Sequence, residues 1–104
     1  MDILGKSHYD LHEIQELLHD PDTRFITQIS FTEAVKLGYA SESDMVERVQ
    51  KLRKTEIHKT MTTRNNNKLW QDVYITTDNN KSLYIKLQKS FDGKGIIISF
   101  KEKT

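Results

Sequence analysis

The spacing of apolar residues changes about halfway along the chain, from a helical period to an alternating one. In the first half, apolar side chains recur every three or four residues, as on the buried face of an amphipathic helix. From residue 56 onward, apolar and polar side chains alternate, as in a strand with one buried face. Residues 1–52 are therefore predicted to be mainly helical, and residues 53–104 mainly β-sheet.

Three helices are predicted in the first half, each marked by a cap or a helix breaker. Pro21 ends the first helix, because proline cannot donate the next backbone hydrogen bond. Ser30 and Glu33 form a capping-box pattern at the start of the second helix, and Gly38 closes it. The predicted elements are helices over 10–19 and 31–37, a helix that Ser41 or Ser43 caps and that reaches about Leu52, and a short extended piece over 23–29.

Short turns rich in Asn, Asp and Gly separate the segments of the second half, which indicates successive antiparallel strands. The predicted strands cover residues 56–62, 69–76, 82–89 and 96–101. In the last strand, strict alternation places Ile96 and Phe100 on the face opposite Ile97. The predicted fold class is α+β, with an antiparallel β-meander in the C-terminal half packed against the N-terminal helices.

The bulk composition restricts the class of protein. At 104 residues the chain is expected to be a single domain over 1–104. It has no cysteine, so it can form neither a disulfide nor a Cys-ligated zinc site. No apolar run approaches the roughly 18 residues of a transmembrane helix, and the N-terminus lacks the apolar stretch of a secretory signal. We therefore expect a cytoplasmic protein with no membrane contact.

Charge is divided unevenly between the two halves. Residues 1–52 hold five Lys and Arg against ten Asp and Glu, a net charge of −5, whereas residues 53–104 hold eleven against five, a net charge of +6. A cationic half attracts polyanions such as RNA or DNA. Lysine-rich strands are also common as solvated faces, so charge alone leaves both interpretations open.

The polar faces of the last two predicted strands carry the residues best suited to chemistry. Tyr84 and Lys86 share one face of their strand. Ser99 and Lys101 share a face of the next strand, so a phenol and two ammonium groups can lie side by side. Lysines neutralise a phosphodiester, and a tyrosine or lysine with a shifted pKa transfers protons. A half-exposed sheet face carries the same residue types in many proteins without such a function.

Other polar residues of this half lie among apolar neighbours. Gln71 shares its parity with Val73, so it lies at an edge or is placed to form a hydrogen bond. Lys59 shares its parity with Ile57; a buried lysine is costly there, whereas one at the rim of a cleft can have its pKa lowered and become a proton donor. His58 is the only histidine of the basic half, and it fits a general base or an ordinary surface side chain. The five Asp and Glu of this half form no carboxylate cluster, so we expect no metal site and no small-molecule cofactor.

Four motifs follow one another in the basic half, and together they carry a family resemblance. They are Lys59-Thr60-Met61-Thr62-Thr63, Trp70-Gln71-Asp72-Val73-Tyr74, Tyr84-Ile85-Lys86 and Ile98-Ser99-Phe100-Lys101-Glu102-Lys103. In this order and at this spacing, they closely resemble the MqsR family of type II toxins, which are mRNA interferases with a RelE-like fold. The N-terminal half is similar more loosely, through His8, Leu11 and the Leu37-Gly38 pair.

The resemblance implies an endoribonuclease that cuts single-stranded mRNA at GCU-like sequences without a metal. Attack of the ribose 2′-OH on the adjacent phosphate would give a 2′,3′-cyclic phosphate and a 5′-OH. The positions that match the family's functional residues are Lys59, Gln71, Tyr84 and Lys101. The residues expected to contact RNA are His58, Arg64, Lys86 and Ser99. The chain departs from the family pattern at His58, where a member of the family has tyrosine.

The resemblance also implies a protein partner, an MqsA-like antitoxin with a zinc-binding part that neutralises the toxin and a helix-turn-helix part that binds DNA. Two other functions fit the same cationic face. A non-catalytic RNA- or ribosome-binding module would bind RNA with a strong salt dependence and leave it uncut. A small interaction domain would have no role in binding nucleic acid.

Overall fold

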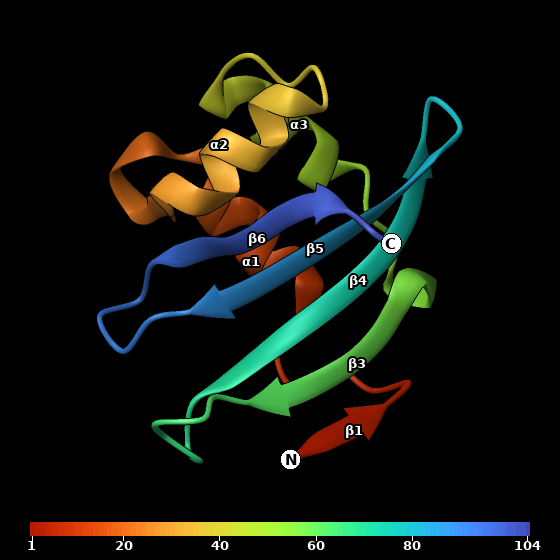
Figure 1. Ribbon diagram of the computed structural model, residues 1–104. Helices are drawn as coiled ribbons and strands as arrows, with labels where there is room; N and C mark the ends of the chain where they lie inside the picture. Colours follow the sequence, from red (N-terminus) through yellow and green to blue (C-terminus); the bar gives the residue numbers. More distant parts are fainter.

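A six-stranded sheet forms the centre of the protein in a computed structural model that describes residues 1–104 (Figure 1). The strands lie in the order β1-β3-β4-β5-β6-β2. They are β1 (Asp2–Leu4), β2 (Arg24–Ile26), β3 (Ile57–Thr62), β4 (Trp70–Asp78), β5 (Lys81–Lys89) and β6 (Gly95–Glu102). The helices are α1 (Leu11–His19), α2 (Gln28–Lys36) and α3 (Glu42–Gln50), with short 3₁₀ helices η1 (Pro21–Thr23) and η2 (Lys54–Glu56). None of the helices is long and apolar enough to cross a membrane.

Strands β3 to β6 form the predicted antiparallel meander, which confirms the α+β class. Each strand boundary lies within two residues of its predicted position. Strand β2, which pairs parallel with β6, occupies part of the extended piece predicted over 23–29. Strand β1, which pairs antiparallel with β3, was not predicted, because its three residues are too few to show an alternating pattern.

Helix α2 begins three residues before its predicted start, and its N-terminal cap is Thr27 rather than Ser30. The Thr27 hydroxyl accepts a hydrogen bond of 3.2 Å from the backbone N–H of Ser30. The buried Ser30 hydroxyl instead donates to the carbonyls of Thr27, at 2.8 Å, and Ile97, at 3.3 Å. Ser30 therefore attaches the helix to β6. The cap predicted for α3 is confirmed at Ser41, whose hydroxyl accepts from the N–H of Asp44.

Strand β2 pairs only with the first residues of β6, and helix α2 lies beside the second half of that strand. The N–H of Thr27 donates to the carbonyl of Ile97 at 3.2 Å, and the Thr27 hydroxyl donates to the carbonyl of Ile98 at 3.1 Å. From there the chain turns into α2, which runs along the border of the sheet (Figure 1). The sheet face turned away from α1 therefore has this helix along its border and is not covered by it.

A β-bulge between β5 and β6 contradicts the strict alternation predicted for the last strand. Leu87 pairs with Ile97, but the preceding residue Lys86 pairs with Ser99. The extra residue brings both Ile97 and Phe100 to the helix-covered face, where each is fully buried. Beyond the bulge, Ser99 lies beside Lys86 on the other face, as predicted.

Helix α1 packs closely against the sheet where β6 begins. A Cβ atom added at Gly95 would lie 3.0 Å from the Leu17 Cβ and 3.2 Å from the Leu18 Cγ. These distances are shorter than ordinary contacts, so a glycine at this position lets the helix approach the strand. The hydrophobic core between the helices and the sheet includes Leu11, Ile14, Leu18, Met45, Val49, Tyr74, Leu83, Ile85, Leu87, Ile97 and Phe100.

Strand β4 also holds the segment that precedes α1. The fully buried carboxylate of Asp72 accepts hydrogen bonds from the backbone N–H groups of His8, at 2.9 and 3.1 Å, and Tyr9, at 2.9 Å. The His8 ring stacks on Trp70 with a centroid distance of 5.3 Å, and the Tyr9 hydroxyl donates to the Trp70 carbonyl. Trp70 and Asp72 therefore have structural roles on the covered face of the sheet.

Candidate functional site

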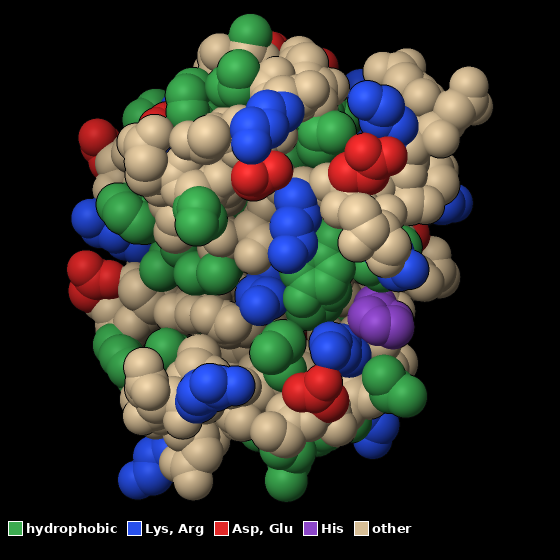
Figure 2. Space-filling view, in the orientation of Figure 1, with side chains coloured by type: hydrophobic (Ala, Val, Ile, Leu, Met, Phe, Trp, Pro, Cys, Tyr) green, Lys and Arg blue, Asp and Glu red, His purple; other side chains and the backbone are tan.

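The sheet face turned away from α1 carries a group of basic side chains along the middle of the molecule (Figure 2). We call it the open face. Along β3, β4, β5 and β6, its residues alternate with those that face the helices. The members considered below are Lys59, Gln71, Val73, Tyr84, Lys86, Ser99 and Lys101.

The strand register arranges these residues in adjacent rows. One row, across β3, β4, β5 and β6, consists of Lys59, Val73, Lys86 and Ser99. Tyr84 and Lys101 are direct partners in the next row. Neighbouring strands are about 4.8 Å apart, and residues two apart on one strand are separated by roughly 7 Å. The structure therefore brings Tyr84, Lys59, Lys86 and Lys101 together in two adjacent rows of one sheet face.

Val73 lies at the centre of this arrangement. It is fully buried, although it is on the open face and outside the main hydrophobic core. Its direct partners in the register are Lys59 and Lys86. The aliphatic stems of the two lysines therefore flank the Val73 side chain on both sides. This packing restricts the positions that the ammonium groups can take.

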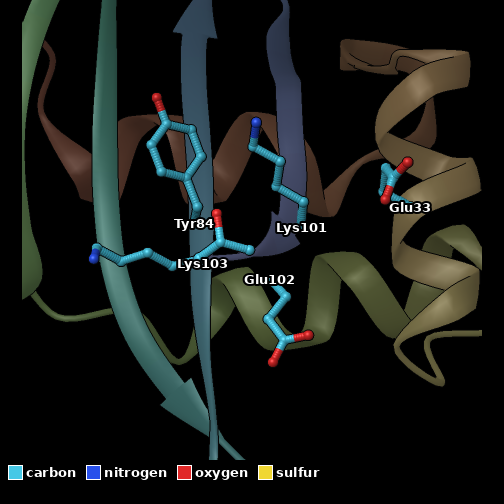
Figure 3. Close-up of a pocket in the computed structure, with 6 residues that line it drawn as sticks. Glu33, Tyr84, Lys101, Glu102 and Lys103 are labelled. Atoms are coloured by element: carbon cyan, nitrogen blue, oxygen red, sulfur yellow. The ribbon is translucent and has the colours of Figure 1, made fainter.

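Tyr84 is in contact with two of the lysines. The Lys101 Nζ lies 5.1 Å from the centre of the Tyr84 ring, and the Lys86 Nζ lies 5.8 Å from it. Figure 3 shows the Tyr84 and Lys101 side chains pointing the same way from neighbouring strands. Burial raises the pKa of the Tyr84 phenol, against a smaller opposing effect of the Lys59 charge. The phenol is therefore protonated near neutral pH and is a proton donor.

Lys59 is held by an acidic residue that the sequence did not single out. The Lys59 Nζ donates to the Asp2 carboxylate at 2.8 Å, and only 21% of the lysine side chain is exposed. This hydrogen bond is the main cause of a raised pKa of Lys59 and a lowered pKa of Asp2. Lys59 therefore does not have the lowered pKa of a proton donor. It is charged at neutral pH, and its ammonium group already has a carboxylate partner.

Lys86 is affected by its surroundings in the opposite direction. Its side chain is partly buried, and burial is the largest cause of a lowered pKa of Lys86. The positive charges of Lys101 and Lys59 act in the same direction. The ammonium form is thus less favourable here than in water, because it loses hydration and gains like-charged neighbours.

A cleft of about 660 Å³ opens beside Tyr84 and Lys101 (Figure 3). Its other lining residues are Glu33, Glu102, Lys103 and Thr104. A second cleft, of about 360 Å³, lies between α2 and β6 and shares Glu33 and Lys101 with the first. Glu33 thus places a carboxylate at the rim of a basic face. Sequence periodicity could not reveal this position, because it depends on where α2 packs.

Gln71 lies on the open face but away from Tyr84. Its side-chain amide donates to the Gln88 carbonyl oxygen at 2.9 Å. Tyr84 pairs with Ile75, which is four residues further along β4, so roughly 13 Å of strand separates the two rows. Gln71 is one row from Lys59 and Lys86, and it faces a neighbouring part of any extended ligand.

The two remaining RNA-contact candidates lie at the edges of the arrangement. His58 is exposed at an irregularity in the pairing of β3 with β4, between Ile57 and Lys59. Arg64 is exposed in the turn between these strands and makes no hydrogen bond or ion pair. Neither residue is among the direct contacts of Tyr84, which are Lys86 and Lys101.

Comparison with known proteins identifies the family of the chain. A family model described as "Motility quorum-sensing regulator, toxin of MqsA" matches residues 6–102. No individual curated protein matches the sequence. The family match extends over the helical half as well as the basic half, and it contains every residue of the open face considered above. The chain therefore belongs to the MqsR family of toxins.

Proposed function

We propose that this chain is the toxin of a type II toxin–antitoxin pair and that it acts as a metal-independent endoribonuclease in the cytoplasm. Its substrate is single-stranded mRNA, cut at GCU-like sequences. The reaction is attack of a ribose 2′-OH on the neighbouring phosphorus. The products are a 2′,3′-cyclic phosphate and a 5′-OH.

The observation that carries this proposal is the placement of three lysines around one tyrosine on an open sheet face. Lys86 and Lys101 lie within 6 Å of the Tyr84 ring centre, and Lys59 is the direct neighbour of Val73 in the row of Lys86. A flat cationic face with an aromatic ring suits single-stranded RNA, whose phosphates meet lysines and whose bases stack on rings.

Lys59 and Lys101 supply electrostatic stabilisation in this mechanism. Charge builds on the phosphate oxygens as the 2′ oxygen attacks, and two nearby ammonium groups lower the energy of that state. The raised pKa of Lys59 keeps it charged throughout the physiological range. Tyr84, whose pKa is also raised, is protonated near neutral pH and carries the proton that the mechanism transfers.

The other residues of the face bind the RNA on either side of the reacting phosphate. Gln71, one row from Lys59, hydrogen-bonds a neighbouring phosphate or base. Ser99 provides a hydroxyl beside Lys86. His58 and Arg64, exposed at the rim, contact more distant nucleotides.

The family also supports a partner for this chain. The matching family is described as the toxin of MqsA, so we propose an MqsA-like antitoxin as the partner that neutralises it. The excess of lysine in the basic half favours an acidic contact surface on that protein.

The proposal is tested by incubating the purified chain with a long RNA in the presence of EDTA. The ends of the fragments are then mapped. We expect breaks at a short recurring sequence, with 5′-OH ends that a kinase can label directly. RNA that shifts on a gel but stays whole would instead identify a non-catalytic binding module. RNA that neither shifts nor breaks would contradict any role in binding nucleic acid.

A further inference from the structure

Lys86 is unusual among the partly buried lysines of the protein, because it has neither a hydrogen bond nor an ion pair. The only other lysines in this class are Lys59 and Lys89. Lys59 is bound to Asp2 and Lys89 to Glu13, each at 2.8 Å. An unpaired ammonium group in a partly buried position loses hydration and gains no partner, so its charged form is disfavoured there.

The side chains that face Lys86 bring more positive than negative charge. Lys101 on β6 lies one row away, and Lys59 on β3 lies in the same row beyond the neutral Val73 of β4. On its own strand, the neighbour on this face is Tyr84, whose ring centre is 5.8 Å from the Lys86 Nζ.

The nearby carboxylates are already engaged or face another lysine. Asp2 of β1 acts on Lys86 only weakly, and its oxygen is bound by the Lys59 ammonium. Glu33 of α2 lines the cleft next to Lys101 and forms an ion pair of 3.3 Å with Lys36. Neither carboxylate is placed to hold the proton on Lys86.

We propose that Lys86 is the general base of the cleavage, which accepts the proton of the ribose 2′-OH, and that Tyr84 is the general acid. This inference rests on the proposed ribonuclease function and assigns its proton transfers. Opposite environments for two neighbouring groups are typical of an acid and base pair. The lowered pKa of Lys86 agrees with the role of base, and Tyr84, whose pKa is raised, is protonated at neutral pH as an acid must be.

The reaction balances with these two groups alone. The neutral amine of Lys86 takes the 2′-OH proton while the 2′ oxygen forms a bond to phosphorus. The bond from phosphorus to the 5′ oxygen breaks, and that oxygen takes the phenol proton of Tyr84. The enzyme is left with a Lys86 ammonium and a Tyr84 phenolate, and transfer of one proton through water restores both.

The other two lysines of the face are less suited to this role. Lys59 is bound to Asp2, which stabilises its charged form and raises its pKa. Lys101 is exposed, so water solvates its ammonium group. Lys86 alone combines partial burial, like-charged neighbours and the absence of an acidic partner.

The test is the pH dependence of single-turnover cleavage of a short RNA carrying one mapped site, between pH 6 and 10. The variants are Lys86→Arg, which keeps the charge but cannot lose its proton, and Lys86→Gln. Lys89→Arg on the same strand is the control, since Lys89 pairs with Glu13 outside the face. Circular dichroism checks folding, and gel shifts measure RNA binding.

We expect the wild-type rate to rise about tenfold per pH unit below the Lys86 pKa, as the neutral amine becomes more abundant. Lys86→Arg should bind RNA within about threefold of wild type and cleave at least about 100-fold more slowly. Lys86→Gln should be equally slow, and Lys89→Arg should resemble wild type.

Two results would overturn the assignment while leaving the ribonuclease function intact. One is cleavage by Lys86→Arg within about threefold of the wild-type rate, with the same pH profile. The other is a wild-type rate that does not change between pH 6 and 8, which needs no variant to fold. Failure of the wild-type protein to cut RNA at any pH would contradict the proposed function itself.

Discussion

The Lys59 ammonium group is hydrogen-bonded to the Asp2 carboxylate across the pairing of β1 with β3, at 2.8 Å. Under the proposed function, Asp2 therefore occupies the position from which an RNA phosphate would contact Lys59. The pair raises the pKa of Lys59 and lowers the pKa of Asp2, so both partners are charged from weakly acidic to alkaline pH. Over that whole range, the phosphate must compete with the carboxylate.

Asp2→Asn should strengthen RNA binding, because it frees Lys59 and removes a negative charge from the rim of the open face. We expect the Kd for a short RNA to fall about two- to fivefold at low salt, as for loss of an exposed competing ion. Asp22→Asn is the charge-matched control, since the Asp22 carboxylate forms no ion pair. Equal tightening in both variants would attribute the effect to net charge and not to the Lys59 contact.

Lys86→Met should make the fold more stable at neutral pH while it abolishes cleavage. A lysine whose pKa is lowered on folding disfavours its charged form in the native state, so stability rises with pH from its folded pKa up to its ordinary value. The variant should gain up to about 1 kcal/mol at pH 7. Urea denaturation at pH 7 and pH 10.5 measures this, and the gain should shrink at the higher pH. A loss of stability at pH 7 would show that Lys86 is a structural residue.

Gly95→Ala should destabilise the protein, because a methyl group at this position would be 3.0 Å from Leu17 and 3.2 Å from Leu18. Helix α1 would have to move away from β6, at a cost of about 1–3 kcal/mol. Lys94→Ala, one residue earlier and exposed, serves as the control. Thermal unfolding of both variants checks the prediction. An unchanged Tm in Gly95→Ala would mean that α1 adjusts without strain.

Asp72→Asn should loosen the segment before α1. The carboxylate accepts three hydrogen bonds from the N–H groups of His8 and Tyr9, and an amide would direct its NH₂ group at one of these donors. We expect a loss of about 1–3 kcal/mol, typical of a buried hydrogen-bond donor left without an acceptor. Hydrogen exchange at His8 and Tyr9 should speed up more than exchange in β5. Protection that is unchanged at these two amides would contradict the structural role of Asp72.

Alternation along the strands was sufficient to predict which face most of the candidate site residues share. Tyr84, Lys86, Ser99 and Lys101 lie together as the two-residue period requires. The same period failed at Ile97, because a β-bulge adds a residue that no local pattern reveals. The prediction held for Ser99 and Lys101 because both lie beyond the bulge on the same side.

The contacts made by the N-terminal half could not be predicted from the sequence. Asp2 reaches Lys59 only because a three-residue strand completes the edge of the sheet, and Glu33 reaches the cleft only because α2 packs along β6. Both contacts join residues more than 50 positions apart, where periodicity carries no information. Gln71 shares the parity of Val73, as predicted, but the distance along β4 separates it from Tyr84.

The most direct test of the proposed catalytic role of the open face is single-turnover cleavage of a defined RNA with EDTA present. The proteins compared are the wild-type chain, Lys59→Ala and Lys101→Ala. Lys94→Ala is the control for lost charge. We expect wild-type fragments ending in 2′,3′-cyclic phosphate, rates at least about 100-fold lower in both face variants, and unchanged circular dichroism. Equal cleavage by all four proteins, or RNA left intact by the wild-type chain, would contradict the account.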